Sequence, residues 1–168
     1  MNFFVKSVLL VNVSVLTSLI IYPVLHEVGH LVGALILHYD IKDISIGSTL
    51  YITFTTDNNA LKAIFLAFSG MIFPFLLSWL IPGKYICLWL IKIAIIVTSI
   101  VVVFLSVIFV FLYLLGVTIT NNDLISVVQL SPNLTCYSIV LSVLIEIMFI
   151  YVLKYQRPFE RLYDYLVK

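Results

Sequence analysis

The chain has 168 residues, of which 63% are hydrophobic and 10% are charged, with a formal net charge of +1 and a mean hydropathy of +1.21. Water-soluble domains carry about 25% charged residues, so this composition places the chain in a lipid bilayer. The near-neutral charge excludes a basic surface for nucleic acid, and the sequence contains no nucleotide-binding motif. We expect one polytopic membrane domain over residues 1–168.

The first predicted membrane span covers residues 3–37. About 20 residues are enough for a helix to cross the hydrocarbon core, so this helix must either tilt strongly or bend. Pro23 removes one helical hydrogen bond and marks the place where a bend is expected. Gly29 and Gly33 form a pair of small residues one turn apart, which lets another helix approach closely.

The same span contains the sequence His-Glu-Val-Gly-His at positions 26–30. Residues i and i+4 lie on one helix face, so His26 and His30 can reach one metal ion. Glu27 lies one step round the helix, where it can take a proton from a metal-bound water. Titratable side chains are rare in apolar sequence. The pattern therefore predicts a zinc site inside the membrane.

A β-hairpin is expected between the first two spans, over about residues 41–56. Residues 41–46 and 50–56 are rich in β-branched and aromatic side chains, and Gly47 lies between them. An open sheet edge cannot face lipid, so the hairpin should pack on the helices or accept an added strand.

Three further spans follow, over about residues 60–81, 85–117 and 134–153. Pro82-Gly83 forms a turn between the first two of these, and residues 118–133 form the only polar interruption in the second half of the chain. Residues 154–168 mix basic and aromatic side chains, which is typical of an amphipathic helix at the membrane interface. The predicted fold is an all-α integral membrane protein with four transmembrane helices and one short hairpin.

Four spans place both termini on the same side of the membrane. Positive charge favours the cytoplasmic side, and six basic residues on the side of the termini outnumber two on the other side. The six are Lys6, Lys84, Lys154, Arg157, Arg161 and Lys168, and the two are Lys42 and Lys62. We expect a multi-pass protein of a prokaryotic cell membrane with cytoplasmic termini.

A hydrolytic zinc site usually has three protein ligands, so a third must join the two histidines. The candidates are His38, Asp40, Asp43, Asp57, Asp123 and Glu146. His38 lies about 12 Å along the helix from His30, too far to share an ion unless the helix breaks. Asp123 follows the third span on the motif's side of the membrane, but reaches the site only if its segment folds back inward. It could instead cap a helix over residues 124–130, while Glu146 lies near the middle of the fourth span.

The motif at positions 26–30 resembles that of site-2 protease type intramembrane zinc metallopeptidases. In that family HExxH lies on one transmembrane helix, and an Asp associated with a later helix completes the zinc site. Gly70 and Pro74 are similar to the Gly/Pro-containing second core helix of the family, and Asn122-Asp123 resembles the Asn-Asp pair of small bacterial members. The resemblance covers about residues 10–155 and implies that His26, His30 and Asp123 bind zinc.

The chain also departs from the family pattern. The Gly-Pro pair of the second core helix is replaced by a glycine and a proline four residues apart, and Leu124 follows Asp123 where a glycine is common. The group that would stabilise an oxyanion or contact substrate is therefore open between Asn121 and Asn122. The family's zinc lies near the cytosol, whereas the charge distribution places the end of the first span on the opposite side.

The predicted function is hydrolysis of peptide bonds in membrane proteins or transmembrane peptides, with Glu27 as general base on the zinc-bound water. The substrate must unwind, because a helix hides its carbonyl groups, and the hairpin edge could hold the unwound segment. A catalytically inactive metal-binding membrane protein, acting as a sensor, transporter or accessory subunit, remains the alternative.

Overall fold

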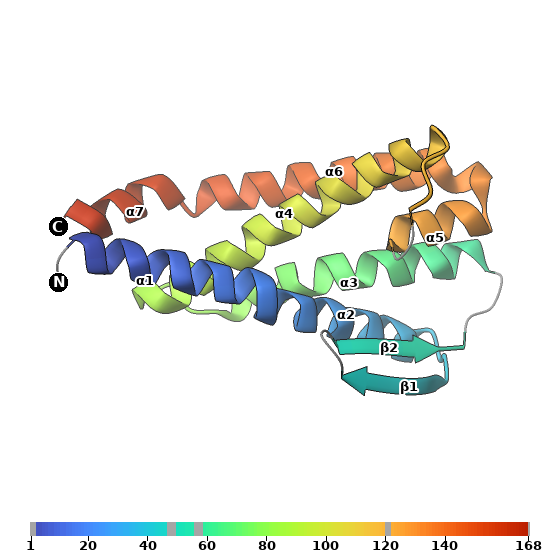
Figure 1. Cartoon of the computed structure of the whole chain (residues 1–168), viewed down its shortest axis with the longest axis horizontal. Coiled ribbons are helices and arrows are strands. Elements are labelled where there is room, and N and C mark those ends of the chain that lie inside the picture. The colour runs from blue at the N-terminus through green and yellow to red at the C-terminus, as the bar shows by residue number, and fades with distance from the viewer. Residues whose placement is uncertain (1–2, 47–49, 56–58, 120–121, 168) are drawn as a thin grey trace.

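The computed structural model in Figure 1 describes residues 3–46, 50–55, 59–119 and 122–167. Four helical stretches are long and apolar enough to cross a membrane, namely Phe3–Ile36, Ala60–Leu80, Ile86–Leu114 and Pro132–Val167. An antiparallel hairpin lies between the first and second of these. The predicted all-α membrane fold with a short hairpin is confirmed.

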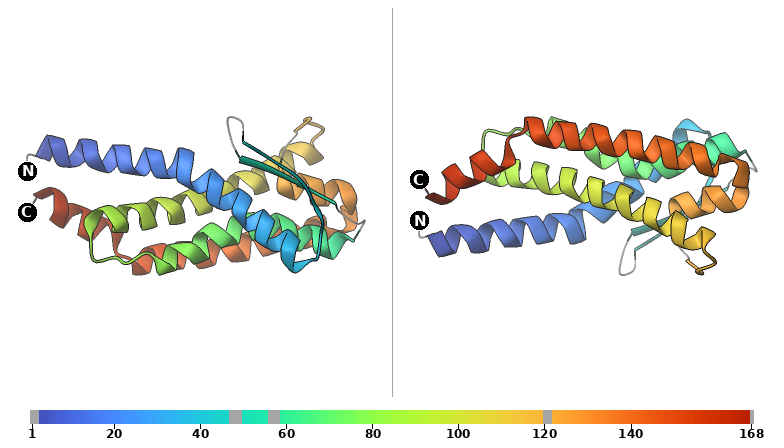
Figure 2. Two further views of the ribbon diagram at one scale, coloured as in Figure 1. Left: turned by 90° about the horizontal axis from the view of Figure 1, so that it is seen from below. Right: turned by 90° about the horizontal axis from the view of Figure 1, so that it is seen from above.

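The first span consists of α1 (Phe3–Leu16), a π-helical turn (Thr17–Ile21) and α2 (Tyr22–Ile36). The Tyr22 N–H reaches back to the Thr17 carbonyl, five residues earlier, and Pro23 follows immediately. A proline ring has no N–H and crowds the preceding turn of an α-helix, so the wider π-turn gives it room. Figure 2 shows the helix changing direction between α1 and α2, one turn before the motif.

The hairpin pairs β1 (Ile41–Ile46) with β2 (Leu50–Phe54), with Ile44 opposite Ile52. Its predicted turn around Gly47 lies outside the described residues. Strand β2 packs against α2 and its Ile52 side chain is buried, whereas the side chains of residues 41–45 are exposed. The hairpin therefore covers the motif-bearing helix with its second strand and presents its first strand to the outside.

Helices α3 (Ala60–Leu80), α4 (Ile86–Leu114) and α6 (Thr135–Tyr155) form the rest of the bundle. From residue 96 onward in α4, and throughout α6, buried residues recur at alternating spacings of three and four, as in coiled coils. They are Ile96, Ser99, Val103, Ser106 and Val110 in α4, and Ser138, Ser142, Ile145 and Phe149 in α6. Small serines at these positions let the two helices approach closely. Helix α7 (Pro158–Val167) follows α6 at the end of the bundle that carries both termini.

Helix α5 (Asp123–Leu130) fixes the position of Asp123. Helix α4 ends with Gly116 at φ 90°, and the N–H groups of Gly116 and Val117 donate to the carbonyls of Tyr113 and Leu112. This pattern satisfies the last carbonyls of the helix and reverses the chain. Figure 1 shows the following segment returning towards α3, and the apolar side chains of α5 join the core of α3, α4 and α6. The inward fold needed to bring Asp123 towards the motif is present.

Candidate metal centre

The two histidines of the motif lie one turn apart on the face of α2 that turns towards α3. His30 is buried, His26 is half-buried, and the two rings meet edge to face with centroids 4.7 Å apart. Tyr22, one turn earlier on the same face, stacks against the His26 ring. The i, i+4 spacing thus places both imidazoles side by side, as the sequence predicts.

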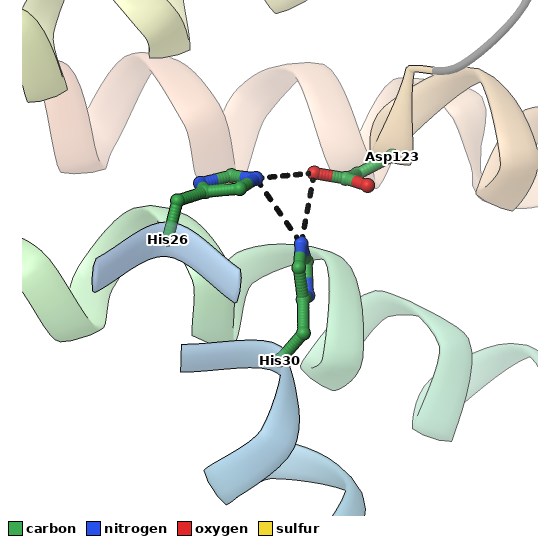
Figure 3. Close-up of side chains that lie close together, drawn as sticks. All are labelled: His26, His30 and Asp123. Carbon is green, nitrogen blue, oxygen red and sulfur yellow. Dashed lines mark hydrogen bonds and ion pairs between the residues drawn. The ribbon is translucent and has the colours of Figure 1, made fainter. Parts of the chain in front are cut away.

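Asp123 completes a triangle with these histidines (Figure 3). Its Oδ2 lies 3.1 Å from His26 Nε2 and 3.2 Å from His30 Nε2, and the two Nε2 atoms are 3.1 Å apart. Zinc bonds of about 2.0–2.1 Å in tetrahedral geometry place neighbouring ligand atoms about 3.3 Å apart. Among the residues that the structure describes, this is the only group of at least three His, Cys, Asp or Glu with such spacing.

The hydrogen bond at His30 Nδ1 indicates which ring nitrogen of His30 carries the proton. His30 Nδ1 lies 2.9 Å from the Leu66 carbonyl oxygen, which can only accept, so Nδ1 carries the proton. The Nε2 of neutral His30 is then an unprotonated acceptor facing the Asp123 oxygen and His26 Nε2. Lone pairs crowded this closely repel one another unless a metal ion, or a proton carried on His26 Nε2, lies between them. The carbonyl also fixes the ring in the orientation that second-sphere partners give to metal-ligating histidines.

His26 differs from His30 in its outer contacts. Its Nδ1 is buried and has no hydrogen-bond partner among the described residues. On this side the ring is therefore held by packing against Tyr22 and not by a hydrogen bond. The outer nitrogens of the two histidines therefore have different surroundings.

Two of the helix contacts beside the site depend on glycine. A Cβ at Gly29 would lie 2.5 Å from the Ser69 carbonyl oxygen and 2.9 Å from the Gly70 Cα, so α2 and α3 touch backbone to backbone there. A Cβ at Gly70 would lie 2.5 Å from His30 Nε2 and 3.0 Å from His26 Cε1. The predicted small-residue face of α2 is therefore occupied by α3 of the same chain, and Gly70 supplies the room for the imidazoles.

Asp123 is the first residue of α5 and is held there by its neighbour. The Asn122 side chain accepts a hydrogen bond from the Ile125 N–H and donates one to Ser106 Oγ of α4. Asn122 is thus the N-cap of α5, which leaves the Asp123 carboxylate free to face the histidines. The alternative of Asp123 as the cap is wrong. Burial alone would raise the pKa of Asp123, but hydrogen bonds donated by imidazoles protonated at Nε2 outweigh burial and hold that pKa below its usual range.

A cavity of about 360 Å³ opens beside the triangle and is lined by Glu27, His30 and Asp123. Its opposite wall comes from the hairpin, through Ile52 and Phe54 of β2, and from Tyr39, which stacks on Phe54. Helices α3 and α5 complete it with Ala63, Leu66, Ala67, Ser126, Val127 and Leu130. The cavity gives Glu27 and the candidate ligands a shared space that a peptide segment could enter.

The remaining candidates for the third ligand lie elsewhere. His38, Asp40 and Asp43 are exposed around the start of the hairpin, and Glu146 is half-buried on α6. Asp57 and Asn121 lie outside the described residues. The sequence does not predict the role of the Leu66 carbonyl, because no side-chain pattern reveals it, or that of Ser106, which reaches the site only through Asn122. The contact of Gly70 with the imidazoles has one signal in the sequence, a glycine in an otherwise bulky apolar helix.

No protein-family model matches the chain, and neither a curated protein nor a solved structure matches it. The structure by itself defines a class, a multi-pass membrane protein with two imidazoles and one carboxylate converging inside its bundle.

Proposed function

We propose that this protein is an intramembrane zinc-dependent endopeptidase of the site-2 protease type. The observation that carries the proposal is the convergence of His26, His30 and Asp123 from segments 93 and 97 residues apart, beside a cavity lined by Glu27. Two imidazoles, one carboxylate and an adjacent glutamate are the groups that zinc hydrolases of the HExxH type use.

The residues that would hold the metal are His26 and His30 through Nε2 and Asp123 through Oδ2. Zinc bound there would supply an electrophile that polarises the scissile carbonyl and makes water more acidic. Two histidines and one carboxylate also suit ferrous iron, so metal analysis forms part of the test. The adjacent Glu27 favours zinc hydrolysis, because this chemistry needs a base beside the metal.

Glu27 acts as the general acid–base group of the proposed reaction. Its carboxylate takes a proton from the attacking water and passes it to the leaving amine nitrogen, so that the peptide bond breaks without releasing a free amide anion. Its place beside His30 and Asp123 in the cavity wall supports this role. The amide of Asn122 already donates to Ser106 and accepts from the Ile125 N–H, so its role here is to position α5. A direct contact between Asn122 and substrate stays a prediction.

The proposed substrate is a membrane protein segment that enters the cavity in extended form. A transmembrane helix hides its carbonyl groups, so it must unwind before hydrolysis. The buried strand β2 contributes Ile52 and Phe54 to the cavity wall, which supports a role for the hairpin in holding the unwound chain. Apolar side chains of the substrate fit these walls.

The decisive experiment compares the wild-type protein with Glu27→Gln and with the control Glu146→Gln, which changes the other carboxylate predicted to lie within a span. Each purified protein is analysed for bound metal and incubated with a transmembrane peptide. We expect about one zinc in all three proteins and cleavage only by the wild type and the control.

Two other results would change the conclusion. Zinc in the wild type without cleavage of any transmembrane peptide would favour metal binding without hydrolysis, as in a sensor or transporter. A wild-type protein that takes up no zinc would overturn the proposal, and iron in its place would point to different chemistry.

A further inference from the structure

A second and larger cavity, of about 820 Å³, lies at the end of the bundle that carries both termini. It is bordered by α1, α4 and the corner between α6 and α7, and it shares no lining residue with the cavity beside the metal centre. It forms because α1 contacts α4 and α7 without contributing a single buried side chain. The cavity walls are mainly apolar: Leu10, Leu90, Ile93, Val97, Ile150 and Leu153.

Such a space must be filled when the protein is in a membrane. An apolar cavity holds water poorly, because water needs several polar partners, and an empty cavity loses the dispersion contacts of its lining atoms. The exposed side chains of α1 are apolar apart from Asn12, so in a membrane they would face lipid. The apolar filler that the surroundings offer is therefore a hydrocarbon chain.

One rim of this cavity is positively charged. Lys154 of α6 and Arg157 of the α6–α7 turn line it, together with Phe159 and Glu160 of α7. The N–H groups of Phe159 and Glu160 lie in the first turn of α7 and have no partner within that helix, a position that favours anions. Glu160 accepts a hydrogen bond from Arg157 at 3.4 Å, but both side chains are exposed, so this contact is weak. A phosphate would find donors and positive charge here.

Trp89 also lines the cavity and is only 2% exposed. Its indole N–H has no hydrogen-bond partner among the described residues but is covered by protein, and the ring also lies against Gly83 and Arg161, so Trp89 contributes apolar wall to the cavity. Arg157 has φ 45° because it ends α6, where its N–H donates to the Lys154 carbonyl, and its side chain lines the rim.

The charge of this end of the bundle selects among lipids. Basic side chains outnumber acidic ones on the segments that meet there, with Lys6, Lys84, Lys154, Arg157 and Arg161 against Glu160 and Asp164. We propose that the cavity binds one anionic glycerophospholipid. An acyl chain lies between α1 and α4, and the phosphate lies against Lys154, Arg157 and the start of α7. This site is independent of the metal chemistry.

Trp89 provides a direct probe of the bound lipid. The chain has two tryptophans, and the other, Trp79, is exposed to lipid on α3, so Trp79→Phe leaves Trp89 as the only tryptophan. This variant is reconstituted in phosphatidylcholine vesicles, and the quenching of Trp89 by brominated phosphatidylglycerol is compared with quenching by brominated phosphatidylcholine. Each basic residue near an anionic headgroup strengthens binding about fivefold, so two should give a preference of about 25-fold.

Lys154→Gln with Arg157→Gln should abolish this preference. The matched control, Lys6→Gln with Lys84→Gln, removes the same charge at the same end of the bundle but outside the cavity, and should keep it. Ala94→Phe, which fills the apolar part, should reduce quenching by both lipids. Circular dichroism checks that each variant folds. If the double variant does not fold, Lys154→Gln and Arg157→Gln are tested singly, and each should lower the preference for the anionic lipid about fivefold.

Three results would overturn the proposal. Equal quenching of Trp89 by the two lipids would mean that the cavity does not select anionic headgroups, and no quenching would mean that no lipid enters it. Equal loss of preference in the control pair would assign the effect to the general charge of this end of the bundle.

Discussion

Gly70→Ala tests whether the close approach of α3 to the histidines is required for metal binding. The added Cβ would lie 2.5 Å from His30 Nε2 and 3.0 Å from His26 Cε1, whereas ordinary contacts begin at about 3.4 Å. His30 Nε2 must therefore move by about 0.9 Å. Its ring cannot swing away freely, because His30 Nδ1 is bonded to the Leu66 carbonyl on the same helix as residue 70.

The displacement can be compared with what a metal site tolerates. Bond lengths in such sites stay within about 0.2 Å of their ideal values, so a shift of 0.9 Å removes His30 from the ligand set. We expect zinc affinity to fall by at least about 100-fold, beyond the range that loss of an outer-sphere partner causes. Helix stability should not fall, since alanine is a better helix former than glycine by about 1 kcal/mol.

The measurement is a competition titration of zinc against a chelator on the purified protein, together with thermal unfolding in the absence of metal. Gly83→Ala is the matched control, because its Cβ would meet only the Arg161 side chain at 3.3 Å and Trp89 at 3.7 Å. Gly29→Ala should instead lower the temperature of thermal unfolding, since its Cβ would meet backbone atoms of α3 and destabilise the fold. Zinc affinity in Gly70→Ala equal to that of the wild type would refute the assignment of these histidines as ligands.

Three other predictions concern the neighbours of the site. Asp123→Asn should lower zinc affinity by more than about 100-fold in the same titration, because a neutral amide replaces the charged ligand, and unchanged affinity would exclude Asp123 from the site. Asn122→Ala should lower stability by about 1 kcal/mol in thermal unfolding through loss of the α5 cap, and zinc affinity about tenfold. Ser106→Ala removes only the link to α4, so it should lower stability and zinc affinity less than Asn122→Ala does. A larger effect of Ser106→Ala would argue against Asn122 as the cap. Ile52→Pro should reduce peptide cleavage and spare zinc binding, because Ile52 lines the cavity but is not one of the three candidate ligands; unchanged turnover would remove the hairpin from the proposed substrate path.

The sequence by itself determined the features that depend on neighbouring residues. Hydropathy predicted four spans, because each helix must satisfy its own backbone in lipid, and β-branched residues predicted the hairpin between the first two. The spacing of His26 and His30 placed both imidazoles on one face, since four residues make about one helical turn. These are local consequences of helix and strand geometry, and the fold retains them.

The tertiary structure decided what brings distant segments together. Asp123 reaches the histidines, 93 and 97 residues away, because Gly116 ends α4 and the chain folds back to bury α5. The cap of α5 is Asn122, and the sequence alone does not distinguish this from a cap at Asp123, one residue later. The Leu66 carbonyl and the space at Gly70 orient the imidazoles through backbone atoms of another helix. The contact of α1 with α4 and α7, to which α1 contributes no buried side chain, leaves the second cavity. Each of these depends on how helices pack, and packing is set by long-range contacts that spacing along the chain does not encode.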